Sequence, residues 1–198
     1  LQMVISYRPL RRLAIISFLY AGMQLCLFTY MVIYLTEDVG MAFIAAGLTL
    51  SAAQMSGTIG RIIWGILADR YIKPGKLLGL LGVGMSLGAV ATAMIQSSWP
   101  LSLILLATIL FGGTAIGWNG VYLAEAARRA PDGQVSAATG GTLFFTFFGV
   151  VLGPPIFGGV VSPTGSYPLA YLFFAVLTLI GGIMTLVSGT IRGSNDTL

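Results

Sequence analysis

Arg61 lies inside an apolar stretch long enough to cross a membrane, and its charge calls for a chemical explanation. A guanidinium among apolar residues is costly, and intramembrane charges usually face a cavity and mark a substrate or ion path. Arginine also binds carboxylates and similar planar anions through two parallel hydrogen bonds. Gln54 precedes Arg61 by seven residues, so on a helix the two side chains share a face. The pair predicts an anion site; the alternative is a structural ion pair with Asp69 or with another part of the protein.

Other polar side chains interrupt the apolar stretches next to aromatic residues. Gln24 follows Tyr20 by one helical turn, and Asn119 lies beside Trp118. Aromatic surfaces with a few convergent polar groups are typical of small-molecule sites. The candidate substrate-binding set is therefore Tyr20, Gln24, Gln54, Arg61, Trp118 and Asn119. The alternative for each amide is hydrogen bonding between helices, worth about 0.6 kcal/mol.

Several kinds of chemistry are excluded by what the sequence lacks. It contains no histidine and one cysteine, Cys26, so neither an intramolecular disulfide nor a Cys/His metal site is available. An intramembrane protease of the rhomboid type would need a Ser-His pair. A channel would need a filter motif or rings of charge, and neither is visible. We predict no catalytic residue, no metal and no cofactor, and we keep a channel or a structural membrane module as the alternatives to transport.

The composition identifies an integral membrane protein. Hydrophobic residues make up 57% of the 198 residues and charged residues only 8%, against about 25% in soluble domains. A bilayer-spanning helix needs about 20 apolar residues. Six continuous apolar runs qualify and predict an all-α, single-domain membrane protein over residues 1–198: about 13–35, 42–68, 77–97, 101–126, 135–161 and 168–190.

The basic residues orient these six spans. With six spans, nine of the ten Lys and Arg residues fall on one side of the membrane, and Arg61 is the tenth. This pattern places both termini in the cytoplasm, and we predict a bacterial inner (plasma) membrane. The net charge of +4 is not a nucleic-acid footprint, because the basic residues lie at span ends. Spans one to three and four to six have similar lengths and opposite orientations, as inverted three-helix repeats of transporters do.

The segment between spans two and three resembles a family signature. The signature Gly-x-x-x-Asp-Arg/Lys-x-Gly-Arg-Arg/Lys of the major facilitator superfamily matches Gly65, Asp69 and Arg70, and Gly75-Lys76 stands in for its end, three residues late. The resemblance implies a gate in which these charges interact with others at the end of span four, namely Glu125, Arg128 and Arg129. The alternative is that they anchor the helix ends in water, where an exposed pair contributes about 0–1 kcal/mol.

Span five carries a second resemblance. Its glycines and proline are similar to the superfamily element Gly-x8-Gly-x3-Gly-Pro-x2-Gly-Gly, which is associated with antiporters, with one extra residue before the last pair. The matching residues are Gly149, Gly153, Pro154, Gly158 and Gly159. The alternative is a proline kink whose freed carbonyl is satisfied by a neighbouring helix.

Together these motifs resemble a six-helix half of a major facilitator transporter, helices seven to twelve, built as two inverted three-helix repeats. The chain begins at Leu1 rather than Met, which we interpret as a cut. The resemblance implies secondary transport of a small solute by alternating access, with the substrate, an organic or inorganic anion, held between two bundles. The partners implied are the lipid bilayer, a small-molecule substrate, and a missing N-terminal half or a second copy of the chain.

Overall fold

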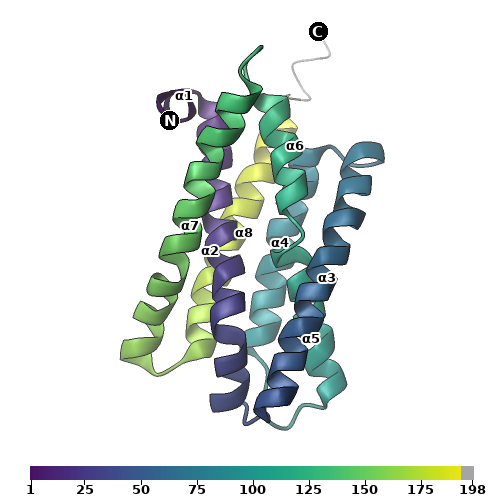
Figure 1. Cartoon of the computed structure of the whole chain (residues 1–198), viewed down its shortest axis with the longest axis vertical. Coiled ribbons are helices and arrows are strands. Elements are labelled where there is room, and N and C mark those ends of the chain that lie inside the picture. The colour runs from purple at the N-terminus through teal and green to yellow at the C-terminus, as the bar shows by residue number, and fades with distance from the viewer. Residues whose placement is uncertain (193–198) are drawn as a thin grey trace.

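The protein is a bundle of α-helices, as the sequence predicts. The computed structural model describes residues 1–192, and no strand occurs among them. The helices are α1 (Gln2–Ser6), α2 (Arg8–Glu37), α3 (Phe43–Arg70), α4 (Pro74–Ala93), α5 (Leu101–Ala115), α6 (Asn119–Arg129), α7 (Val135–Thr164) and α8 (Tyr167–Arg192) (Figure 1). The long helices run side by side, and α2 begins at the same end of the bundle at which α8 ends.

Five segments of the described chain are long and apolar enough to cross a membrane. They are Arg8–Glu37, Pro74–Ala93, Leu101–Arg129, Val135–Thr164 and Tyr167–Val187. The 28-residue helix α3 is absent from this set because polar side chains such as Gln54 lower its hydropathy. At about 1.5 Å per residue it is nevertheless long enough to span a bilayer. It lies parallel to the other helices (Figure 1), so six spans remain the prediction, with α3 as the most polar.

The apolar run 101–126, predicted as one span, is two helices in the structure. α5 ends at Ala115 and α6 begins at Asn119, and the turn between them contains Gly117. Glycine is a poor helix former. A Cβ atom at this position would clash with the carbonyl oxygen of Gly113, so only glycine fits the turn. Hydropathy alone does not detect such a break, because the turn is as apolar as the helices beside it.

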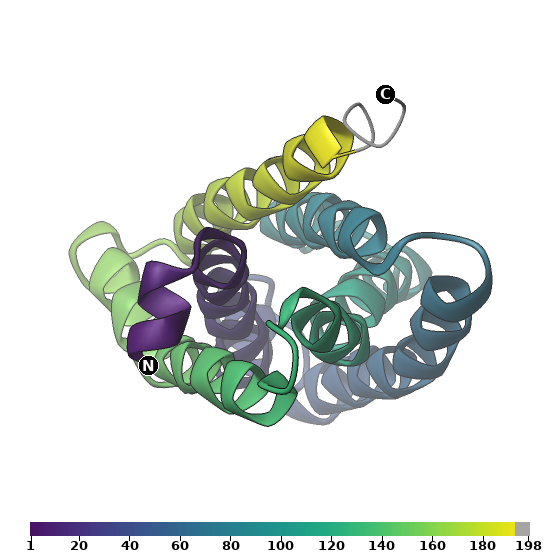
Figure 2. The same ribbon diagram turned by 90° about the horizontal axis from the view of Figure 1, so that it is seen from above.

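The helix pairing has the symmetry of two three-helix repeats. The most extensive contacts join α2 to α7, α3 to α5 and α4 to α8. The first repeat consists of α2, α3 and α4, and the second of α5–α6, α7 and α8. When each helix is exchanged for its counterpart in the other repeat, the α2–α7 pair becomes the α5–α3 pair, and the α4–α8 pair is unchanged. In the view from above, α4 and α8 lie along one side of the bundle (Figure 2).

Glycines bring the paired helices into backbone contact. A Cβ atom at Gly153 would lie 2.6 Å from the Cα atom of Gly22, where α7 crosses α2. A Cβ atom at Gly112 would lie 2.6 Å from the carbonyl carbon of Ala53, where α5 crosses α3. Small residues at helix crossings are typical of membrane proteins, in which dispersion contacts replace the hydrophobic effect.

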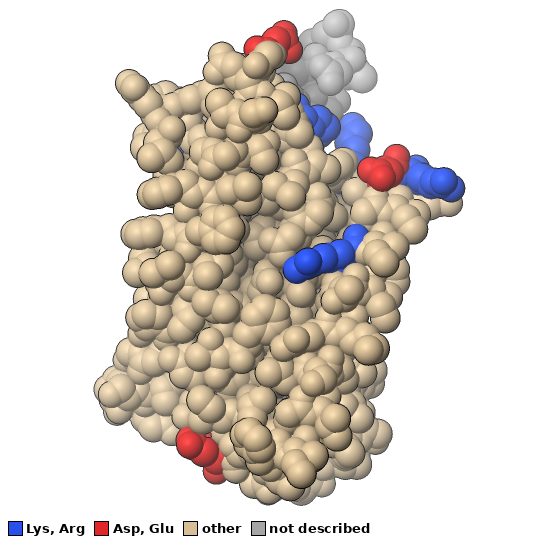
Figure 3. All heavy atoms as spheres, viewed as in Figure 1, with Lys and Arg blue, Asp and Glu red and all other residues tan. Residues whose placement is uncertain are grey.

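Charged side chains gather at the two ends of the bundle, and the surface between them is apolar. On the face shown in Figure 3, basic atoms lie toward one end, with one basic side chain isolated on the apolar surface between the ends. Arg61 is the basic residue that lies within a long apolar helix away from its ends. The side chain of Arg192 and residues 193–198, the end of the predicted domain, lie outside what the structure describes.

Candidate substrate-binding site

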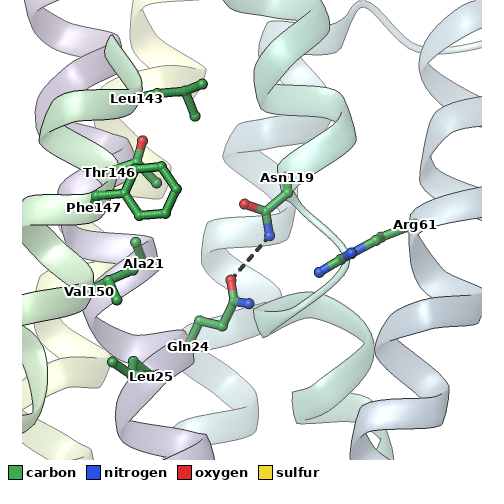
Figure 4. A pocket seen from close by; sticks show the side chains of 9 residues that line it. All are labelled: Ala21, Gln24, Leu25, Arg61, Asn119, Leu143, Thr146, Phe147 and Val150. Atoms are coloured by element: carbon green, nitrogen blue, oxygen red, sulfur yellow. Dashed lines mark hydrogen bonds between the residues drawn. The ribbon is translucent and has the colours of Figure 1, made fainter. Parts of the chain in front are cut away.

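A pocket of about 340 Å³ opens between α2, α3, α6 and α7 (Figure 4). Its polar groups come from α2, α3 and α6, whereas α7 contributes a mainly apolar wall. The lining residues are Ala21, Gln24, Leu25, Arg61, Asn119, Leu143, Thr146, Phe147 and Val150. Three of the predicted binding residues, from three separate helices, therefore meet in one pocket.

Gln24 is held by two donors that fix its orientation. Its Oε1 atom accepts hydrogen bonds from Nε1 of Trp118 and from Nδ2 of Asn119, both at 3.1 Å. An indole N–H only donates, so the oxygen of Gln24 must face Trp118 and its Nε2 group must point elsewhere. No described residue accepts a hydrogen bond from this Nε2 group. The amide is therefore a free donor at the pocket.

Arg61 reaches from α3 toward Gln24 and Asn119 (Figure 4). Its Nε atom donates to the carbonyl oxygen of Ile116 at 3.2 Å, in the turn between α5 and α6. No carboxylate of the described residues pairs with Arg61, so the alternative of an ion pair with Asp69 is not realised within them. Its two terminal nitrogens are left to face the pocket, and they form the fork that binds a carboxylate with two hydrogen bonds.

Trp118, Tyr20 and Gln54 do not line this pocket. Trp118 is fully buried behind Gln24 and holds it in place. Tyr20 is also buried; its hydroxyl donates to the carbonyl oxygen of Leu78 at 3.2 Å, and its ring packs edge-on against Trp118. Gln54 is exposed on α3. It shares a helix face with Arg61, but it precedes Arg61 by seven residues and therefore lies about 10 Å away along the helix axis.

The α7 wall was not predicted from the sequence. Its members, Leu143, Thr146, Phe147 and Val150, follow a spacing of three, one and three residues, which places them on one helix face. Thr146 is tied to the rest of the site because its Oγ1 atom lies 3.4 Å from the hydroxyl of Tyr122 on α6. α7 is apolar on every side, so periodicity gave no sign of which face meets the pocket.

The predicted gate residues form a smaller network than expected. Glu125 has a fully buried side chain, and it accepts hydrogen bonds from Nε of Arg128 at 2.8 Å and from Nε of Arg129 at 2.6 Å. Asp69 and Arg70 are exposed, and neither forms an ion pair with a described residue. The exposed side chain of Lys76 is likewise unpaired within that part of the chain.

The first turn of α4 contacts α6 through Gly75, whereas Asp69 at the end of α3 makes no such contact. A Cβ atom at Gly75 would lie 2.6 Å from Oε1 of Glu125, so the first turn of α4 rests against the buried carboxylate. The positive end of the α4 dipole favours a carboxylate at this position. The charged cluster of Glu125 therefore joins α6 to α4 at the end of the bundle.

Gly65, the first glycine of the signature, faces open space: a Cβ atom there would meet nothing within 4 Å, whereas one at Gly60 on the same helix would be in contact. We expect Gly65→Ala to raise the free energy of unfolding by up to about 1 kcal/mol through helix propensity. Gly60→Ala should lower it by about 1–3 kcal/mol, because the new Cβ would lie 2.7 Å from the carbonyl oxygen of Gly113. Thermal unfolding in detergent compares the two variants; a destabilised Gly65→Ala would mean that another part of the full-length protein packs there.

The span-five motif serves helix packing within the described chain. α7 runs as one α-helix through Pro154, whose own carbonyl oxygen accepts a hydrogen bond from the Tyr30 hydroxyl at 2.9 Å. Gly153 contacts α2, as does Gly149, and a Cβ at Gly158 would lie 2.9 Å from the Tyr30 hydroxyl. Gly159, by contrast, meets open space. The motif therefore packs α7 closely against α2.

Comparison with known proteins identifies the family to which the motifs point. The family model described as Major Facilitator Superfamily matches residues 13–195. The chain belongs to the major facilitator superfamily. It is consequently an integral membrane protein of a transporter fold and not an enzyme.

Relatives within the superfamily are named for carboxylate substrates or have no assigned substrate. The probable galactarate/D-glucarate transporter GudP of Escherichia coli (strain K12) is 28% identical over 80% of this chain and 36% of its own length. The uncharacterised MFS-type transporter YuxJ of Bacillus subtilis (strain 168) is 32% identical over 69% of this chain and 35% of its own. Human monocarboxylate transporter 11 is 26% identical over 74% of this chain and 32% of its own. The chain spans about a third of the length of these relatives.

A solved structure has the same fold. The crystal structure of a variant of the E. coli fucose:proton symporter FucP superposes with a TM-score of 0.78 at 20% identity. The match covers 93% of this chain and 43% of that chain. The all-α fold predicted for a major facilitator half-bundle is thus confirmed.

Proposed function

We propose that the chain is the C-terminal six-helix half of a secondary transporter that carries a small organic anion by alternating access, with Arg61 binding the carboxylate. The observation that supports this most is the guanidinium of Arg61, which lies on a pocket between four helices and pairs with no carboxylate of residues 1–192. A charge held there without a carboxylate partner is costly unless a ligand or water forms hydrogen bonds with it. The relatives named above are in part named for sugar acids and monocarboxylates, which share the carboxylate group.

The pocket has an excess of donors over acceptors. Arg61 offers its terminal nitrogens and Gln24 its Nε2 group, while Nδ2 of Asn119 is already bonded to Gln24 and to the carbonyl of Ile116. A carboxylate is an acceptor-only group, so it satisfies donors of this kind. The wall that α7 contributes is mainly apolar, which lowers the local dielectric beside these donors and strengthens charge-assisted bonds.

The second half of the site comes from an N-terminal six-helix bundle that faces α2, α3, α6 and α7. Substrate sites of such transporters lie near the membrane midplane between the two bundles. Two helices, α4 and α8, pack against each other behind the pocket-lining helices, which leaves the pocket side for the partner bundle. A second copy of this chain is the alternative partner, and the mass of the purified transporter distinguishes the two.

The test is counterflow in proteoliposomes containing the full-length protein. Vesicles loaded with unlabelled D-glucarate, succinate, L-lactate or acetate are given a trace of the labelled compound, with D-glucose as the neutral control. We expect saturable counterflow of at least one carboxylate and none of glucose. Counterflow also separates a carrier from a channel, because a channel gives no overshoot of the labelled solute.

Arg61→Gln should abolish counterflow, and Arg61→Lys should raise KM at least about tenfold, because an ammonium group cannot bind a carboxylate in the bidentate mode. Lys73→Gln removes an exposed charge at the membrane end and should leave KM unchanged. Unchanged KM in both Arg61 variants would mean that Arg61 is structural. Transport of glucose alone would refute an anionic substrate.

A further inference from the structure

Two donors on α3 match two carbonyl groups at the break between α5 and α6. Nε1 of Trp64 donates to the carbonyl oxygen of Gly113 at 2.8 Å, and Nε of Arg61 donates to that of Ile116 at 3.2 Å. The donors are three residues apart on α3, and the acceptors are three residues apart on the broken segment. Each pair is separated by about one helical turn, but the order is reversed: the earlier donor, Arg61, bonds the later carbonyl, and Trp64 bonds the earlier one. Because α3 and α5 run in the same direction along the bundle (Figure 1), the two side chains reach in opposite directions along α3 and bond the broken segment at two separate points.

The carbonyl groups need these donors because the helix ends there. The last carbonyls of an α-helix have no intrahelical partner. An unsatisfied carbonyl at membrane depth costs several kcal/mol, so backbone breaks persist only where a neighbour supplies a donor. Ile116 receives a second bond, from Nδ2 of Asn119 at 3.3 Å, whereas for Gly113 the only side-chain donor among the described residues is Trp64.

Two glycines, Gly60 on α3 and Gly117 in the turn between α5 and α6, make room for the indole ring. A Cβ atom at Gly117 would lie 2.6 Å from Cδ1 and 2.7 Å from Nε1 of Trp64. A Cβ atom at Gly60 would lie 3.0 Å from the same Nε1 atom. Any side chain at either position would displace the indole from the Gly113 carbonyl. The break, the two glycines and the tryptophan are thus one built contact, separate from the pocket lining.

We propose that Trp64 is a positioning residue for transport: it anchors the α5 side of the break, so that an anion bound by Arg61 acts on the α6 side. This proposal rests on the proposed anion site. Arg61 shares its guanidinium between the Ile116 carbonyl, through Nε, and the pocket, through its terminal nitrogens. An anion that draws the guanidinium toward the pocket changes its bond to Ile116, and α6, which begins three residues later, follows.

This arrangement separates the roles of the two donors. Arg61 touches the substrate, so changing it alters affinity. Trp64 is not among the pocket-lining residues, so changing it alters the rate at which the loaded carrier rearranges and leaves affinity almost unchanged. A purely structural role would lower the amount of folded protein and leave both constants of the folded fraction as in the wild type.

The experiment compares the full-length wild type with Trp64→Phe, Trp64→His and Trp99→Phe. Phenylalanine keeps an aromatic ring and removes the N–H donor, whereas histidine restores a ring N–H. Trp99 lies in the loop before α5 and serves as the matched tryptophan control. Hydrogen–deuterium exchange of residues 112–122 is measured without any anion, and KM and the maximum rate of counterflow are measured with D-glucarate, or with L-lactate if D-glucarate is not carried.

We expect Trp64→Phe to speed exchange over residues 112–122 by about tenfold, the effect of losing one partly buried hydrogen bond. The maximum rate should fall by about tenfold, with KM within twofold of the wild type. Trp64→His should recover at least part of both effects, and Trp99→Phe should resemble the wild type. If Trp64→Phe does not fold, Trp64→His is compared with the wild type. Faster exchange and a lower maximum rate with KM within twofold would support the proposal, and unchanged exchange and rate would contradict it.

Unchanged exchange and unchanged maximum rate in Trp64→Phe would overturn the proposal. So would an increase in KM as large as that of Arg61→Lys, since Trp64 would then belong to the binding site. Failure of the anion site itself is recognised separately, because the exchange measurement uses no anion. In that case substitution of Arg61 would leave KM unchanged, whereas Trp64→Phe would still speed hydrogen–deuterium exchange over residues 112–122.

Discussion

Replacing Glu125 with glutamine is expected to lower the free energy of unfolding by about 3–5 kcal/mol. The carboxylate is fully buried and accepts hydrogen bonds from both Arg128 and Arg129. Its loss would leave the guanidinium of Arg129, which is only 12% exposed, without a compensating charge. The remaining positive charges would also lie beside Gly75, at the positive end of the α4 dipole.

Thermal unfolding in detergent at low salt measures this effect, which corresponds to a decrease in Tm of roughly 6–20 °C. Arg128→Gln is the matched control, because the Arg128 side chain is 53% exposed and an exposed partner contributes about 0–1 kcal/mol. The double variant Glu125→Gln/Arg129→Gln should be more stable than Glu125→Gln alone, since it removes the uncompensated charge. Equal Tm values for wild type and Glu125→Gln would contradict a stabilising role for the cluster.

Replacing Gly112 with alanine is expected to destabilise the protein by about 3 kcal/mol, at the upper end of the usual effect of overpacking. The new methyl group would clash with the carbonyl oxygen of Ala53 and lie 2.8 Å from its Cα atom. Both atoms belong to the backbone of α3, so relief requires the two helices to separate. Separation would also lengthen the bonds from Trp64 and Arg61 to the segment after Gly112.

Gly47→Ala is the control for this variant, because Gly47 lies on α3, the helix that Gly112 of α5 contacts, and a Cβ atom there would meet nothing within 4 Å. Thermal unfolding of both variants separates the effect of the helix crossing from that of glycine removal in general. A Gly112→Ala protein that unfolds at the wild-type temperature would mean that α3 and α5 are not in backbone contact in the membrane.

Hydropathy predicted the helical bundle because a bilayer requires a long apolar run in each span. The six apolar runs correspond to α2, α3, α4, the α5–α6 pair, α7 and α8. Gln24, Arg61 and Asn119 were predicted as site residues because a polar side chain in an apolar stretch requires a partner, and the structure brings the three to one pocket.

Features that depend on the distance between helices could not be predicted from the sequence. Asp69 and Glu125 have the same chemistry, and only the fold places Glu125 against Gly75 and leaves Asp69 exposed. The break at Gly117 was hidden because glycine is common throughout the chain, with 27 residues among 198. Tyr20 precedes Gln24 by four residues, and this spacing suggested that both line the site. The ring of Tyr20 faces the core instead, because two residues four apart on a helix can contact different neighbours.

The polarity of α3 sets the order in which this chain can enter the membrane during synthesis. When the ribosome has just made α3, the donors of Trp64 and Arg61 have no acceptors, because their partner carbonyl groups come 49 and 55 residues later in the chain. The segment with Gly113 and Ile116 must leave the translocon before α3 can give up its contacts with water or with the insertion machinery. We therefore expect α3 to stay at the translocon until α5 arrives and the two helices to partition into lipid as a unit.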